Sequence, residues 1–137
     1  MRFYDIFHSV QPSTITKPEN EWKSYKETKT MEQRLKESEL ILSKFNDKIP
    51  VIVNECPVEF RSRFHRKMLV KQEMTMTEFL YQIRKKFNVH CEETVIVFTN
   101  NKIIPGSKTF YEIYKEEKDS DGFLYVDVCK ENAFGHN

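Results

Sequence analysis

A helix flanked on both sides by β-branched segments is the feature that most constrains how this chain folds. Thr75 is followed three residues later by Glu78, the capping-box pattern in which each side chain accepts a hydrogen bond from the other residue's backbone N–H. Beyond this start, apolar residues recur at helical spacing. They are Met76, Phe79, Leu80, Ile83 and Phe87. Residues 75–87 are therefore predicted to form a helix with one face packed on a sheet.

Five segments dense in β-branched and other apolar residues surround this helix. They span residues 49–56, 67–71, 94–99, 102–104 and 123–129, and a short helix is predicted over 109–117. Asn100 and Asn101 predict a tight turn, because asparagine tolerates a positive φ. The order strand, strand, helix, strand, short strand, short helix, strand is that of the ubiquitin-like β-grasp. The predicted fold class is therefore α+β, with a mixed four-stranded sheet crossed by a helix.

Helical material is predicted before the sheet. Residues 21–29 favour a short polar helix with Trp22 and Tyr25 on one side. Residues 31–45 show apolar positions near a 3.6-residue period. These positions are Met31, Leu35, Ile41 or Leu42, and Phe45. Residues 1–20 contain the stretch SVQPSTITKPEN, whose prolines discourage regular structure, so we expect a mobile extension before one domain over 21–135.

Composition narrows the class of protein. The chain has 39% hydrophobic and 31% charged residues and a net charge of +1, so its overall charge points neither to nucleic acid nor to an acidic partner. No apolar run approaches the ~20 residues of a membrane span, and the first ten residues lack the continuous apolar stretch of a secretory signal. The three cysteines are odd in number and widely spaced, which argues against a disulfide framework and favours the cytosol or nucleus.

Catalytic and metal-binding patterns are weak. The three glycines are too scattered for a phosphate-binding loop. His90 and Cys91 are adjacent, but neighbouring residues of a strand face opposite ways, so a packed thiol is favoured over a nucleophile. Histidines 8, 65, 90 and 136 show no ligand spacing with the cysteines, so no metal or cofactor is expected. We therefore do not expect an enzyme.

A cluster of basic residues precedes the helix predicted over residues 75–87. It consists of Arg61, Arg63, His65, Arg66 and Lys67, next to Phe60 and Phe64. It could bind an anion or RNA, but a solvated loop beside a sheet edge protected by charge is favoured.

Several stretches carry a family resemblance. They are KIPVIVNE, KMLV, TEFLYQIRKKF, FTNNKIIPGSKTFYEIY, and EEKDSDGFLYV followed by ENAFG. Together they resemble the autophagy ubiquitin-like modifiers, the relatives of the GABA-receptor-associated protein and of microtubule-associated protein light chain three. The resemblance runs from about Trp22 to Gly135, in one register apart from the loop between the first two strands. It implies a β-grasp preceded by two N-terminal helices, in agreement with the elements predicted above.

The resemblance also implies a modifier that works through its C-terminus. A cysteine protease would remove His136 and Asn137, with Phe134 as the aromatic before the cleavage site. E1-like and E2-like enzymes would then transfer Gly135 to phosphatidylethanolamine. A glycine suits this role because it permits close approach in narrow active sites. The monomeric protein would be cytoplasmic before conjugation and would lie on autophagosomal membranes after it, anchored by two acyl chains.

A second implied function is the capture of cargo receptors. Peptides with an aromatic-x-x-aliphatic motif would add as a strand beside the second strand of the sheet. Residues that match the family's first pocket are Glu37, Ile41, Pro50, Ile52, Lys67, Leu69 and Phe123. Residues that match the second are Met68, Val70, Met74, Phe79 and Ile83. Lys48, Lys67 and Lys86 would attract acidic residues around the motif. Core packing is the alternative for each apolar residue, most strongly for Ile52, Phe79 and Ile83.

The chain departs from the family in two places. Lys71 stands where a proline usually follows the second strand, and Gln82 replaces a leucine of the second pocket. A more polar pocket wall predicts narrowed or altered motif preference.

The extension itself contains the motif. Phe3 to Ile6, FYDI, fits aromatic-x-x-aliphatic and could dock in the chain's own groove or in a neighbour's. Alternatively, the apolar residues near the start touch the membrane, or residues 1–20 are a disordered tail. Those apolar residues are Phe3, Tyr4, Ile6 and Phe7. For the whole chain, the alternative function is a protein-binding β-grasp adaptor that is never lipidated.

Overall fold

A computed structural model describes residues 24–55, 65–86, 89–90 and 92–130. The helices are α1 (Tyr25–Thr28), α2 (Met31–Lys44), α3 (Met76–Lys86) and α4 (Phe110–Glu117). The strands are β1 (Lys48–Glu55), β2 (His65–Lys71), β3 (Val95–Thr99), β4 (Lys102–Ile103) and β5 (Leu124–Lys130). Every predicted element that falls within these residues is present, and β2 begins two residues before the predicted strand.

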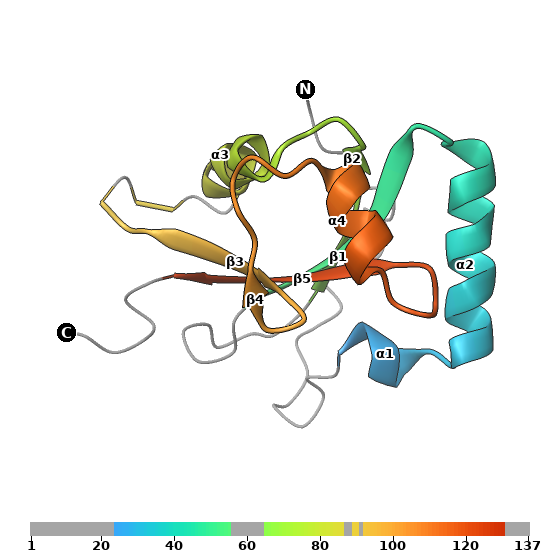
Figure 1. The fold of residues 1–137 in the computed structure, drawn as a ribbon. Coiled ribbons are helices and arrows are strands. Elements are labelled where there is room, and N and C mark those ends of the chain that lie inside the picture. Colours follow the sequence, from blue (N-terminus) through green and yellow to red (C-terminus); the bar gives the residue numbers. More distant parts are fainter. Residues whose placement is uncertain (1–23, 56–64, 87–88, 91, 131–137) are drawn as a thin grey trace.

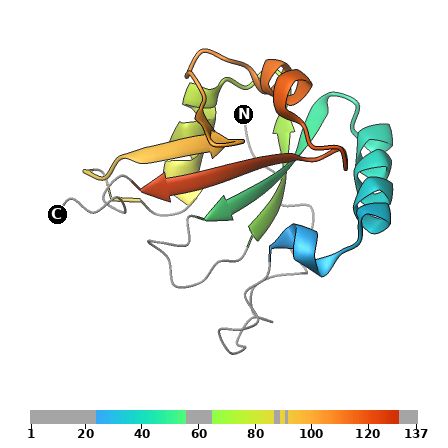
Figure 2. The same ribbon diagram turned by 60° about the horizontal axis from the view of Figure 1, so that its bottom comes forward.

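One mixed sheet organises the chain, with the strand order β2-β1-β5-β3-β4. The central pair, β1 and β5, is parallel, whereas β1–β2, β3–β5 and β3–β4 are antiparallel. The predicted α+β β-grasp with two N-terminal helices is confirmed, and the short β4 adds a fifth strand at one edge of the sheet. Figure 1 shows α3 and α4 on one side of the sheet and α1 on the other, and Figure 2 shows α2 beside the end of the sheet.

Local sequence signals account for the boundaries of α3 and of the β3–β4 turn. The Thr75 N–H donates to Glu78 Oε1 at 3.0 Å, and the Glu78 N–H donates to Thr75 Oγ1 at 3.2 Å, so the predicted capping box is confirmed. Asn100 and Asn101 have φ of 52° and 64°, as the predicted turn requires. Phe87, the last residue of the predicted stripe, lies outside the described residues.

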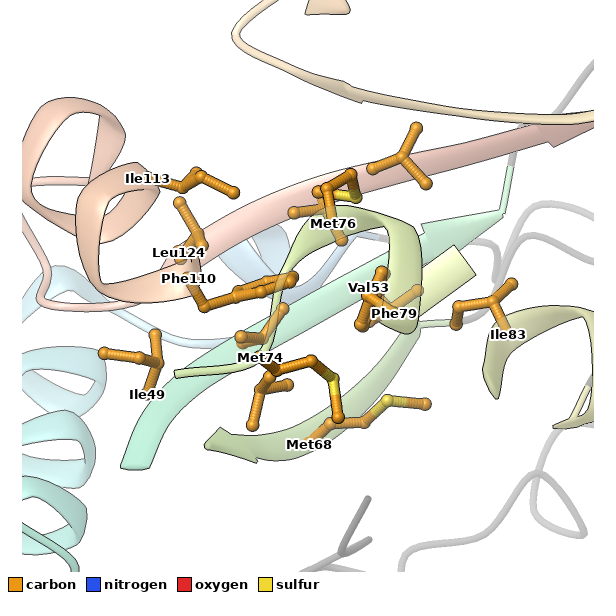
Figure 3. Packing of buried hydrophobic residues seen from close by; sticks show 14 of the residues in the cluster. Ile49, Val53, Met68, Met74, Met76, Phe79, Ile83, Phe110, Ile113 and Leu124 are labelled. Atoms are coloured by element: carbon orange, nitrogen blue, oxygen red, sulfur yellow. The ribbon is translucent and has the colours of Figure 1, made fainter. Parts of the chain in front are cut away.

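Alternation along β1 separates two apolar clusters. Ile49, Val51 and Val53 face the main core, which also receives the buried side chains of α3 and α4. Figure 3 shows this packing, in which Phe79 and Ile83 of α3 lie over the sheet together with Phe110 and Ile113 of α4. Ile52 belongs to the opposite cluster. That cluster consists of Tyr25, Ile41, Ile52, Leu69 and Phe123.

The buried face of α2 differs from the predicted stripe. Met31 and Phe45 are exposed, at 41% and 36%, whereas Arg34, Ser38 and Ile41 are buried. Two of these buried residues are polar and bind Asp121, which precedes β5: Arg34 through its guanidinium and Ser38 through its hydroxyl. The pattern of apolar residues therefore predicted the burial of Ile41 correctly, but it wrongly placed Met31 and Phe45 on the buried face and missed Arg34 and Ser38.

Two further observations bear on the sequence predictions. Cys129 of β5 is disulfide-bonded, whereas the odd number and wide spacing of the cysteines argued against a disulfide framework. Among the described helices, none combines the length and apolar character of a membrane span.

Candidate functional site

The edge strand β2 divides the predicted pocket residues between the two faces of the sheet. Among the residues that the structure describes, β2 pairs with β1 alone. Leu69 lies opposite Pro50 and Lys67 lies opposite Ile52, so these side chains share the face of the smaller cluster. Met68 belongs to the main core on the other face. The two predicted pockets therefore lie on opposite faces of one edge strand.

The first predicted pocket is assembled from four parts of the chain. Ile41 comes from α2, Ile52 from β1, Leu69 from β2, and Phe123 from the residue just before β5. All four side chains are buried. The structure therefore brings together, in one apolar cluster, residues that lie up to 82 positions apart in the sequence.

A polar group lies beside this apolar cluster. Lys67 Nζ lies 3.1 Å from Glu37 Oε2, and Lys29 Nζ lies 3.5 Å from Glu37 Oε1, which also accepts a hydrogen bond from the Tyr25 hydroxyl. Burial acts to raise the pKa of Glu37, but the Tyr25 hydrogen bond and the charge of Lys67 hold it below its usual value. Burial lowers the pKa of Lys67, an effect that Glu37 opposes. Glu37 is thus a largely buried carboxylate that a tyrosine hydroxyl and two lysines hold in place.

Tyr25 is the residue of this site that sequence reasoning missed. It is 1% exposed, and its ring packs edge-on against Phe123 with the centroids 5.4 Å apart. Lys67 Nζ lies 4.8 Å from the centre of the same ring. The available signal was an aromatic residue within an otherwise polar helix, which predicted a buried side but not its neighbours.

The second predicted pocket forms part of the main core. Its residues are each at most 1% exposed, as the core-packing alternative expected. They are Met68, Val70, Met74, Phe79 and Ile83. Figure 3 shows Met68 and Met74 close together, with Phe79 and Ile83 on the overlying α3. Gln82, next to Ile83, is half-buried.

The three predicted cations are divided between the two faces. Lys67 lies with the smaller cluster, and Lys48 lies opposite Lys71 at the other end of the β1–β2 pair. Lys86 is exposed in the last turn of α3, which covers the opposite face. Phe134 and Gly135 lie outside the described residues.

His65, at the start of β2, should make stability depend on pH. Burial against Tyr25, with a centroid distance of 5.2 Å, and the charge of Lys67 lower the pKa of His65 from 6.5 to about 4. The unfolded chain therefore binds a proton that the folded chain does not, and stability should fall as pH falls from about 6.5 to about 4. Glu37 opposes this shift and Lys29 adds to it.

The test is the urea midpoint between pH 7 and pH 5. His65→Gln should reduce the loss of stability on acidification, whereas replacing the exposed His90 by glutamine should not. Equal pH dependence in wild type and His65→Gln would contradict this account.

Comparisons with known proteins identify the family. A family profile described as "Autophagy protein Atg8 ubiquitin like" matches residues 33–135. Autophagy-related protein 8 of Candida glabrata is 37% identical over 114 residues, which cover 82% of this chain and 97% of the relative. Autophagy-related protein 8a of Arabidopsis thaliana is 36% identical over 113 residues, which cover 82% and 93%.

A solved structure agrees with these sequence matches. The crystal structure of Trypanosoma brucei ATG8 superposes with a TM-score of 0.70 at 29% identity, and covers 81% of this chain and 97% of that one. The family description is that of a ubiquitin-like protein, which confirms the expectation of a modifier rather than an enzyme. The chain belongs to the Atg8 family of autophagy-related ubiquitin-like proteins.

Proposed function

We propose that this protein is conjugated through Gly135 to phosphatidylethanolamine on autophagosomal membranes, where it recruits cargo receptors that carry aromatic-x-x-aliphatic motifs. Membership of the Atg8 family supports the proposal, and so does the extent of the family match, which ends at Gly135. In this proposal residues 21–135 form the working domain, and His136 and Asn137 are removed by a cysteine protease. E1-like and E2-like enzymes then act on the cytoplasmic protein.

One observation carries the peptide-binding part. Successive side chains of a strand point to opposite faces, so residues i and i+3 of an added strand lie on opposite faces of the sheet. The two candidate pockets flank β2 in this way, with Leu69 on one face and Met68 on the other. An aromatic-x-x-aliphatic peptide beside β2 therefore directs its aromatic residue to one pocket and its aliphatic residue to the other.

Charge supports the same site. β2 has the sequence HRKMLVK, which contains three positively charged side chains, Arg66, Lys67 and Lys71, and no acidic one. An edge strand of this kind resists pairing with its own copies but attracts an acidic strand. Because the pocket residues are buried in the free chain, binding requires them to move apart. In the first cluster the Tyr25 ring packs against Phe123, and Lys67 lies over the Tyr25 ring.

The test is titration of a labelled acidic motif peptide into the full chain, followed by amide NMR of the complex. We expect micromolar binding, with the largest shifts in residues 65–71, and loss of binding when the peptide's aromatic residue is replaced by alanine. A folded chain that binds no such peptide, or one whose largest shifts lie at β4 on the far edge, would contradict the proposed site.

The departure at Gln82 yields a prediction of its own. Gln82 is half-buried, and it replaces the leucine that the family resemblance assigns to the wall of the second pocket, so its amide should disfavour a large aliphatic side chain there. Gln82→Leu should therefore tighten binding of leucine-containing motif peptides by roughly 3- to 10-fold. The same change on the exposed position Tyr81 serves as the control and should leave affinity unchanged. Unimproved affinity in Gln82→Leu would refute this role.

The alternative is an adaptor that binds motif peptides at β2 and is never lipidated. This alternative is favoured because none of the candidate site residues lies after Phe123 in the sequence, so peptide binding at β2 does not involve Gly135. The two functions differ in the fate of the terminus, since conjugation requires loss of His136 and Asn137.

A further inference from the structure

We infer that the chain carries its own competitor for the β2 site: residues Phe3–Ile6 bind there in cis and are displaced by receptor motifs. This inference rests on the proposed function, because it assigns a regulator to the same peptide site. Residues 1–23 lie outside the described residues, so the inference is carried by the length, sequence and attachment point of this segment together with the geometry of β2.

The extension is not shared with the relatives. The matches cover 93–97% of the relatives but only 82% of this chain. Because the family match reaches residue 135, the unmatched part lies almost wholly at the N-terminal end. Self-occupation of the site would therefore be a property of this chain and not of the family as a whole.

The chain that leads back to the extension leaves the described residues close to the site. The described residues begin at Ser24, which caps α1, and Tyr25 of α1 is part of the first cluster. Residues 7–23 would link the motif to that point and can span about 55–60 Å when extended. β2 has seven residues and is only about 23 Å long, so the linker can reach any position along it.

Phe3–Ile6 has the spacing and charge that the site requires. Phe3 and Ile6 are three positions apart and so face opposite sides of a strand. Asp5 supplies a negative charge for the basic β2. A second match in the extension, Phe7–Val10, has the same spacing but contains no acidic residue. The charge of the site thus selects Phe3–Ile6.

Tethering makes weak binding sufficient. A short flexible tether gives an effective concentration on the order of 1 mM. If the free segment bound with a dissociation constant of about 100 μM, it would occupy the site about nine-tenths of the time and weaken an external peptide about tenfold.

The experiment compares three full-length proteins in the same peptide titration. Phe3→Ala/Ile6→Ala should bind a labelled acidic motif peptide about tenfold more tightly than wild type. The matched control, Phe7→Ala/Val10→Ala, removes the second aromatic-x-x-aliphatic match, which contains no acidic residue. This variant should bind the peptide with wild-type affinity. Light scattering at the titration concentration should show monomers throughout.

The outcomes separate this inference from the proposed function. If no protein binds the peptide, the proposed site fails and the inference fails with it. If all three bind with equal affinity, the site stands and the inference is overturned. A gain in the Phe7/Val10 control alone, or a wild-type dimer that the Phe3/Ile6 change dissociates, would also overturn it. So would loss of vesicle binding in the Phe3/Ile6 variant with unchanged peptide affinity, since the segment would then contact the membrane.

Discussion

Replacing Asp121 by alanine should lower the free energy of unfolding by about 3–5 kcal/mol, because it leaves a buried guanidinium without its counter-ion. The Asp121 side chain is fully buried, and its Oδ2 accepts hydrogen bonds from Arg34 Nη1 at 2.6 Å and from the Tyr125 hydroxyl at 2.5 Å. Its Oδ1 accepts the Phe123 N–H at 2.9 Å. One carboxylate thus joins α2 to the start of β5.

Urea denaturation of two further variants isolates the cause. Lys26→Met removes an exposed ion pair with Asp119 and should cost about 1 kcal/mol or less. Adding Arg34→Met to Asp121→Ala should recover part of the loss, because the unpaired buried charge is then gone. If Asp121→Ala costs no more than Lys26→Met, the buried pair does not hold α2 on the sheet.

Shortening the peptide motif by one residue should weaken binding by roughly 10- to 100-fold. In an aromatic-x-aliphatic peptide both anchors point to the same face of the added strand, so only one of them can enter its pocket. Full burial of one apolar side chain is worth about 1.5–3 kcal/mol, and each 1.4 kcal/mol is a factor of ten in affinity.

The measurement is a competition series with peptides of identical composition and charge, in which only the spacing between the anchors varies. When the two anchor residues are one or three positions apart, their side chains point to opposite faces of the sheet. Adjacent anchors, however, lie too close together for one to reach the pocket around Leu69 while the other reaches the pocket around Met68. We expect i+3 to bind best and i+2 to fall to the level of a peptide with a single anchor. Equal affinity for i+2 and i+3 would show that the peptide does not add as a strand beside β2.

Local signals predicted the elements well, and the reason is physical. The Thr75–Glu78 capping box and the Asn100–Asn101 turn are satisfied within a few residues, so the sequence around them suffices to predict them. The burial of Arg34 and Ser38 on α2 was not predicted, because it depends on Asp121, which lies 87 residues from Arg34 in sequence. No periodicity in residues 31–45 contains that information.

The candidate site, too, could be predicted only in part from the sequence. Its apolar residues follow from the family resemblance, and the alternation of β1 and β2 places them on two faces. The contacts of Tyr25 could not be predicted, because they join α1 to Glu37 of α2 and to Phe123 just before β5. Such contacts depend on how the N-terminal helices pack against the sheet, and only the folded structure shows this.

The use of Gly135 as the conjugated terminus is tested most directly by intact mass spectrometry of the full chain after incubation with an autophagy-competent cell extract. An Atg8-family relative that the same extract lipidates is the positive control. The chain should lose His136 and Asn137 and then gain the mass of one phosphatidylethanolamine less that of one water, which leaves when the amide forms, and Gly135→Ala should not form this adduct. A wild-type chain that keeps both terminal residues while the relative is processed would contradict the conjugation account.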